Sequence, residues 1–179
     1  RGRPVGRWEK GRRVPRGRDI RIAGGDDMTD PESLQATVEQ LGKHPEARLC
    51  ATGSHVINSE GKIISWPEPF DHWEEDGTAH LYGSYDYLLN HMLKYNSVYN
   101  ASMVLFRKEG CLEGICSEYR HMHYCGDWLF WVEQVRKGSV IEIRRKLNYF
   151  RKHTSNTTYL GAEDGRSLPA IAFIKTWPC

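Results

Sequence analysis

The stretch IRIAGGDDMTDPESL (residues 20–34) decides how the rest of this chain is interpreted. An apolar, strand-like approach (Ile20, Ile22, Ala23) leads into Gly24-Gly25-Asp26-Asp27, and a helix start follows at Asp30-Pro31. Two adjacent carboxylates at a strand end suit Mg²⁺ or Mn²⁺, which take hard oxygen ligands and keep several waters. Asp and Gly are also common turn residues, so these four residues alone favour a simple turn.

Alternating helical and extended patterns follow this stretch. Asp30 caps a predicted helix with Pro31 at its first position, and Leu34, Val38 and Leu41 repeat at helical spacing. The remaining expected elements are a strand over 49–57, a turn over 58–61 with an extended arm over 62–64, an irregular loop over 66–83, a helix over 85–93, a strand over 101–106, a helix from Asp127 to Gly138, and an extended segment over 140–150. The pattern predicts a single α/β unit.

The composition is that of a soluble globular domain. The chain has 179 residues, 39% of them hydrophobic and 27% charged, which is enough to bury one core. No apolar run approaches the roughly 20 residues needed to cross a bilayer. The cysteines are scattered without a C-x-x-C pair, which indicates a reducing, cytoplasmic compartment: Cys50, Cys111, Cys116, Cys125 and Cys179.

Positive charge gathers in residues 1–21, which hold nine Lys and Arg against two acids, although the formal net charge of the chain is only +2. Such a basic segment can bind nucleic acid or associate peripherally with an anionic membrane. A solvated terminus, partly helical or disordered, is the commoner case. Nucleic acid is the less favoured partner, because the rest of the chain is acidic. Deleting residues 1–21 would discriminate between these alternatives.

Four sequence blocks in this order form a known pattern. They are the stretch from Ile20 to Leu41, NSVYNASMVLFR (96–107), YCGDWL (124–129) and LNYFRKH (147–153). Together they resemble the family 2 glycosyltransferases of the GT-A fold, which have a Rossmann-like mixed sheet flanked by helices. The resemblance covers residues 8–158, and it implies a C-terminal portion of a GT-A domain over 22–158 with a tail over 159–179.

The resemblance implies roles for individual residues. Asp26 and Asp27 match the acidic motif that holds Mg²⁺ or Mn²⁺ against the diphosphate of a nucleotide-sugar, most simply a UDP-sugar. Asp127 matches the general base of an inverting transfer to an acceptor hydroxyl. As a helix cap, Asp127 is expected to stay ionised and to be only a modest base. If Asp26 and Asp27 did not match the acidic motif, a purely structural role as a helix cap would be the better interpretation of Asp127.

Other site residues stay open between two interpretations. Arg151 and His153 face the same side of an extended segment and can reach phosphate oxygens, with a solvated basic strand end as the equal alternative. Trp128 and Trp131 can stack on a sugar, but aromatic residues on an apolar helix are more often core. The acceptor, whether glycan, lipid-linked or protein, and the oligomeric state cannot be read.

Two departures from the family pattern bear on activity. Gly24 stands where the family usually has an acidic residue, and Pro15 interrupts a segment that is ordinarily helical. The family also has one more βαβ region before this point, which holds the nucleotide base and ribose. The chain therefore reads as a fragment incomplete at the N-terminus, and little or no activity is expected from the isolated 179 residues.

Two further patterns compete with this interpretation. Zinc-ligand residue types cluster without the usual pair spacing: Cys111, Cys116, His121, His123 and Cys125. The triplets starting at Asn100 and Asn156 match the glycosylation acceptor pattern, which matters only in a secreted protein. The two triplets are treated as chance, whereas a small zinc-binding domain stays an alternative function that metal analysis of the purified protein would test.

Overall fold

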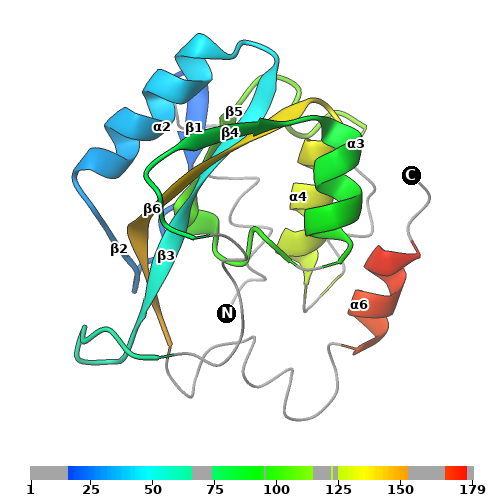
Figure 1. Ribbon diagram of the computed structural model, residues 1–179. Helices are drawn as coiled ribbons and strands as arrows, with labels where there is room; N and C mark the ends of the chain where they lie inside the picture. The colour runs from blue at the N-terminus through cyan, green and yellow to red at the C-terminus, as the bar shows by residue number, and fades with distance from the viewer. Residues whose placement is uncertain are drawn as a thin grey trace.

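The computed structural model describes residues 16–65, 74–94, 96–114, 122, 125–152 and 168–176. They form an α/β fold with a mixed, curled sheet and helices on both faces (Figure 1). The strands are β1 (Asp19–Arg21), β2 (Met28–Thr29), β3 (Ala47–Ile57), β4 (Ala79–Tyr82), β5 (Val104–Arg107) and β6 (Ser139–Arg151). The helices are α2 (Glu32–Lys43), α3 (Ser84–Tyr87), the π-helix η1 (Leu88–Met92), the 3-10 helix η2 (Ala101–Met103), α4 (Gly126–Val135) and α6 (Leu168–Lys175).

Strands β3 and β6 form the centre of the sheet and run parallel. The strand order is β1-β5-β3-β6-β2, and β4 also pairs with β6. Strands β1, β2, β4 and β5 all pair antiparallel with their neighbours. Parallel strands covered on both faces need apolar side chains on both sides, and the first part of β6, at Val140, Ile141 and Ile143, provides them.

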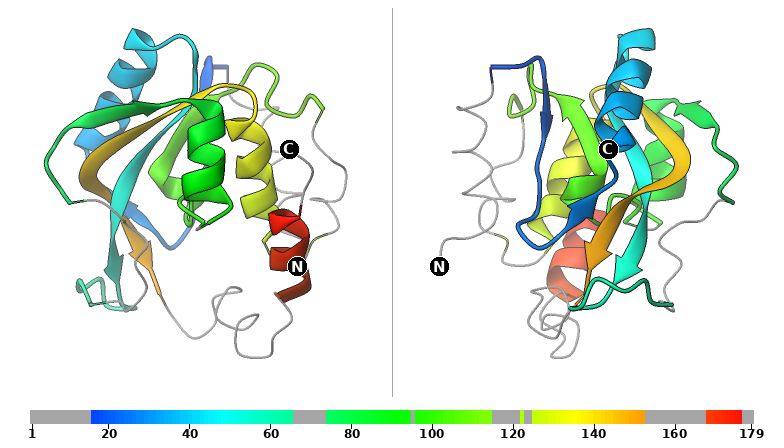
Figure 2. Two further views of the ribbon diagram at one scale, coloured as in Figure 1. Left: turned by 45° about the vertical axis from the view of Figure 1, so that its right-hand side comes forward. Right: turned by 90° about the vertical axis from the view of Figure 1, so that its left-hand side faces the viewer.

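Helices cover the two faces of the sheet unequally. Helix α2 covers one face, where Leu41 packs with Cys50, Leu105 and Ile141. The elements α3, η1, α4 and α6 cover the other face, which holds the larger core, and α6 lies beside α4 (Figure 2). We call this larger side the α4 face.

Two short connections fix the direction of the helices. Helix α2 ends at Lys43 and β3 begins at Ala47, while α4 ends at Val135 and β6 begins at Ser139. The second turn is tight: a Cβ on Gly138 would lie 2.7 Å from the Glu46 carbonyl oxygen. Helices α2 and α4 therefore lie on opposite faces with their N-termini directed toward the side where β3 and β6 end (Figure 1). We call this side of the sheet the carboxyl edge.

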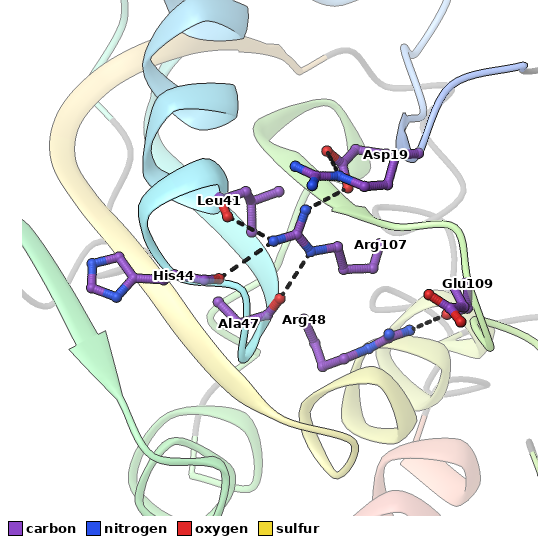
Figure 3. Close-up of polar contacts among 8 residues, drawn as sticks. Asp19, Leu41, His44, Ala47, Arg48, Arg107 and Glu109 are labelled. Atoms are coloured by element: carbon purple, nitrogen blue, oxygen red, sulfur yellow. Dashed lines mark hydrogen bonds and ion pairs between the residues drawn. The ribbon is translucent and has the colours of Figure 1, made fainter.

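A buried arginine, Arg107, connects several elements at the opposite end of the sheet, where β3 begins (Figure 3). Arg107 donates to the main-chain oxygens of Leu41 at 2.6 Å and Ala47 at 3.3 Å, and it pairs with Asp19 Oδ1 at 3.0 Å. These contacts join the last turn of α2, the start of β3 and strand β1 through one side chain. Carbonyls at a helix C-terminus favour a cation.

Most of the predicted elements are confirmed. The first helix begins where expected, and Asp30 Oδ1 accepts the N–H of Glu32 at 2.8 Å. Strand β3, the helix before Gly138 and the long strand β6 also match. The turn at 58–61 forms, but its second arm makes only an isolated bridge between Ile63 and Ile57.

Two predictions were wrong in detail. The loop over 66–83, expected to be irregular, contains strand β4. Helix α6 lies within the weakly patterned segment 159–179, and β1 agrees with the strand-like approach expected at Ile20. On α2 the buried residues are Ser33, Thr37 and Leu41, whereas Leu34 and Val38 are 52% and 44% exposed. The face of α2 that packs on the sheet is therefore not the face that carries Leu34 and Val38. The packing face carries the small polar residues Ser33 and Thr37, which let the helix lie close to the sheet.

Candidate functional site

The carboxylate of Asp27 is the centre of a hydrogen-bonded turn at the carboxyl edge. Its Oδ2 accepts from Asn100 Nδ2 at 2.9 Å and from Ser102 Oγ at 2.7 Å, and its Oδ1 accepts the main-chain N–H of Arg151 at 3.1 Å. One side chain therefore links the residue 24–27 loop, η2 and the end of β6. We call residues 24–27 the acidic turn.

The partners of Asp27 are themselves fixed. Asn100 caps η2, since its Oδ1 accepts the N–H of Ser102 at 2.7 Å. Ser102 Oγ also accepts the N–H of Gly24 at 2.8 Å, and the Ser102 carbonyl accepts from Arg21 Nε at 2.8 Å. The arrangement is preorganised because each polar group has a defined partner.

Gly24 is required by this geometry. A Cβ on Gly24 would lie 2.5 Å from Asp27 Oδ2 and 3.2 Å from Ser102 Oγ. The acidic residue that the resemblance places at this position would collide with the Asp27 carboxylate.

Asp26 differs from Asp27 in its surroundings. Asp26 is exposed, and its main-chain oxygen accepts from Arg151 Nε at 2.7 Å. The adjacent Gly25 borders open space, because a Cβ there would meet nothing within 4 Å. Of the two aspartates, Asp26 is the one that can approach a ligand from solvent.

Arg151 joins the acidic turn to the turn that follows β3. Its Nη1 donates to the carbonyls of Asn58 at 2.7 Å and Ser59 at 3.0 Å, in addition to the bond from Nε to Asp26. These contacts orient the guanidinium along the carboxyl edge. The role of Arg151 in binding phosphate stays a prediction, and His153 lies outside the described residues.

Asp127 lies in the first turn of α4. The predicted helix cap was wrong by two residues: α4 begins at Gly126, and Cys125 precedes it in the left-handed conformation, at φ 59°. Asp127 Oδ1 accepts the N–H of Trp128 at 2.9 Å. A non-glycine residue with positive φ is strained, and such strain often accompanies functional sites.

The ionisation of Asp127 also departs from expectation. Burial of its carboxylate raises the pKa of Asp127 above the usual aspartate value, and hydrogen bonds from the main-chain N–H groups of Trp128 and Asp127 only partly oppose this. The same environment raises the pKa of the Cys125 thiol to about 11. The modest basicity predicted for a capping carboxylate is therefore wrong, because desolvation outweighs the helix N-terminus.

The acidic turn and Asp127 lie at different points of the sheet. Asp27 is bonded to the end of β6, whereas α4, whose last turn leads into the start of β6, has its N-terminus directed toward that end. Among the hydrogen bonds of the described residues, none joins the acidic turn to Asp127 directly. Open α/β sheets bind their ligands at the carboxyl ends of the strands.

The acidic turn fits a divalent cation only in part. A carboxylate offers about four lone-pair directions, and three hydrogen bonds already occupy the oxygens of Asp27. In the described part of the chain, no group of three or more His, Cys, Asp or Glu side chains can hold a metal.

The remaining sequence candidates are placed as follows. Cys111 is buried and Cys125 partly exposed, neither of them in a disulfide, while Cys116, His121 and His123 lie outside the described residues. Trp128 and Trp131 are 6% and 0% exposed and belong to the core. Asn100 is 7% exposed and bonded to Asp27, which is incompatible with a glycan on its amide.

The sequence interpretation missed the partners of Asp27. Asn100-Ala101-Ser102 was treated as a chance glycosylation pattern, although Asn followed two residues later by Ser before an apolar run is also a capping arrangement. It also missed the aromatic pair of Tyr99 and Phe150, whose ring centroids are 6.0 Å apart. Both residues lie within the sequence blocks 96–107 and 147–153, but the resemblance assigns neither of them a role.

Comparisons with known proteins identify no family for this chain. A scan against protein-family models finds no match, and a search of curated proteins finds none either. None of the helices in the described ranges has the length and apolar character needed to span a membrane.

Proposed function

We propose that this chain carries the site of an inverting glycosyltransferase of GT-A type that uses a nucleotide-diphosphate sugar, with UDP as the nucleotide. The acceptor is a hydroxyl of a glycan, lipid-linked or protein substrate. The observation that carries the proposal is the acidic turn at the carboxyl edge, held by the three hydrogen bonds to Asp27, with Asp127 in the first turn of a helix that is directed toward this edge.

The two aspartates of the acidic turn take different parts. Asp26 is exposed and would hold Mg²⁺ or Mn²⁺ jointly with the donor diphosphate. A bound cation supplies charge neutralisation for the leaving diphosphate. Asp27 positions Asp26 by fixing the turn to η2 and to β6, and the Arg151 guanidinium next to it adds positive charge near the diphosphate.

The environment of Asp127 supports its role as the base. The acceptor oxygen would attack the anomeric carbon in line with the departing diphosphate, and a carboxylate oxygen of Asp127 would take the acceptor proton. A base works best when its pKa lies near the operating pH. The desolvation that raises the pKa of Asp127 moves the carboxylate in that direction.

Paramagnetic NMR with Mn²⁺ and UDP tests the proposal even if binding is weak. The amide signals of Gly25 and Asp26 should broaden when both Mn²⁺ and UDP are present, and not with Mn²⁺ alone. Asp26→Asn should weaken this metal-dependent binding by at least about tenfold, which corresponds to about 1.4 kcal/mol. Asp127→Asn should leave it unchanged while abolishing sugar transfer in any preparation that turns over.

Asp86→Asn is the matched control for this experiment. Asp86 is exposed on α3, and the neighbouring Ser84 bonds to Val135 at the far end of α4 from Asp127. The control should bind UDP and Mn²⁺ as the wild type does. Equal losses in Asp26→Asn and Asp127→Asn, or broadening that does not depend on UDP, would contradict the proposal.

A further inference from the structure

Two aromatic side chains meet directly beside the acidic turn. The rings of Tyr99 and Phe150 lie 6.0 Å apart at an interplanar angle of 45°, and Lys152 Nζ lies 4.7 Å from the centroid of the Phe150 ring. All three residues are partly exposed. The core aromatic residues Tyr87 and Trp131 are, in contrast, fully buried.

The hydrogen bonds of Asp27 place this aromatic pair. Tyr99 precedes Asn100, and Phe150 precedes Arg151, and these two following residues both donate to the Asp27 carboxylate. Tyr99 and Phe150 are therefore each the chain neighbour of a residue that bonds to the Asp27 carboxylate. The pair cannot move away from the turn without breaking these bonds.

Tyr99 also packs against the core of the α4 face, which includes Trp128, the residue next to Asp127. Side chains alternate along a strand, so Phe150 and Tyr149 point to opposite sides of β6: Phe150 meets Tyr99, and Tyr149 stacks on His55 at 5.3 Å.

We propose that Tyr99, Phe150 and Lys152 form a binding site for a pyranose ring. This inference rests on the proposed function and names the substrate contact of the same site. The apolar C–H face of a sugar packs against an aromatic ring, as aromatic side chains provide a large apolar surface. The Lys152 ammonium carries three hydrogen-bond donors, which suit the hydroxyls at the sugar rim.

The sugar belongs either to the donor or to the acceptor, and both present the same chemistry to these side chains. Saturation-transfer NMR with methyl glucoside, methyl galactoside and methyl N-acetylglucosaminide tests binding without the nucleotide. At least one sugar should receive saturation from the protein. If UDP-sugar displaces that sugar, the site takes the donor sugar; if both bind together, it takes the acceptor.

Substitutions connect the signal to these residues. Phe150→Leu and Tyr99→Leu keep apolar volume but remove the ring, and each should weaken sugar binding by about three- to tenfold. Lys152→Gln should also weaken sugar binding, and because Lys152 is partly exposed the substitution should leave the packing of the core unchanged. Tyr149→Leu, one residue away on the opposite face, is the matched control and should bind sugar like the wild type.

The outcomes separate this inference from the proposed function. No saturation of any of the three sugars, or equal effects of Phe150→Leu and Tyr149→Leu, would overturn the sugar site even if UDP and Mn²⁺ bind as expected. Sugar binding that depends on Phe150 and Lys152, in a chain that binds no UDP, would support the sugar site while rejecting the transferase proposal.

Discussion

At the residue scale, Gly24 controls the shape of the acidic turn. Gly24→Ala would place a Cβ 2.5 Å from Asp27 Oδ2, an atom held by two other side chains. Forcing a methyl group into packed structure costs about 1–3 kcal/mol. We therefore expect Gly24→Ala to lower the free energy of unfolding by about that amount, as measured by urea denaturation, and to weaken UDP binding.

The neighbouring glycine supplies the control for this prediction. A Cβ on Gly25 would meet nothing within 4 Å. Gly25→Ala should therefore change the free energy of unfolding by less than about 1 kcal/mol. If both substitutions have the same effect, the close approach of Gly24 to Asp27 is not what the turn requires.

A second prediction at the residue scale concerns Asp127 and pH. Burial raises the pKa of Asp127 in the folded protein. Between the unfolded and folded pKa values the native state keeps a proton that the unfolded state has lost, so this group lowers stability as pH rises. Asp127→Asn keeps the acceptor for the Trp128 N–H but removes the charge.

The stability difference between Asp127→Asn and the wild type should therefore depend on pH. Relative to the wild type, the variant should gain free energy of unfolding as the pH is raised from about 3, where both side chains are neutral, to about 7. Thermal unfolding across this range measures the difference. A gain that is independent of pH would show that the carboxylate of Asp127 is not desolvated.

At the element scale, Arg107 holds α2, β3 and β1 together. Arg107→Met would leave Asp19, whose side chain is 12% exposed, without its buried partner and would remove donors from the carbonyls of Leu41 and Ala47. Breaking a buried ion pair by removing one partner costs about 3–5 kcal/mol. We expect Arg107→Met to lower the free energy of unfolding by about this amount in chemical denaturation.

Arg18→Met tests whether burial matters for that effect. Arg18 pairs with the same Asp19 at 3.5 Å, but its side chain is 66% exposed. Exposed pairs contribute about 0–1 kcal/mol, so Arg18→Met should be close to neutral. If Arg18→Met lowers the free energy of unfolding as much as Arg107→Met does, the stability comes from pairing the charge of Asp19 and not from the bonds of Arg107 to the carbonyls of Leu41 and Ala47.

Elements with strong local signals could be predicted from sequence. The Asp30-Pro31 start defined α2, and the apolar run from Val140 defined β6. Strand β4 has four residues and is mostly exposed, so its register depends on β6 and not on its own pattern. Helix α6 packs through Ile174 onto a core formed by distant segments, which no local pattern reveals.

At the scale of the whole molecule, the candidate site could be predicted only in part. Adjacent aspartates before a helix are visible in the sequence, but the partners that distinguish Asp27 from Asp26 are not. Asn100, Ser102 and Arg151 lie 73, 75 and 124 positions from Asp27. The pKa of Asp127 was misjudged for the same reason, since desolvation arises from tertiary packing and a cap is a local feature.

The long strand β6 has a consequence for how this protein is made. It pairs with β2, β3 and β4, all of which precede it in the chain. During synthesis these three segments leave the ribosome with exposed hydrogen-bonding edges and wait for residues 139–151. Contacts of such long sequence separation form slowly, and chains halted before β6 should aggregate or recruit chaperones.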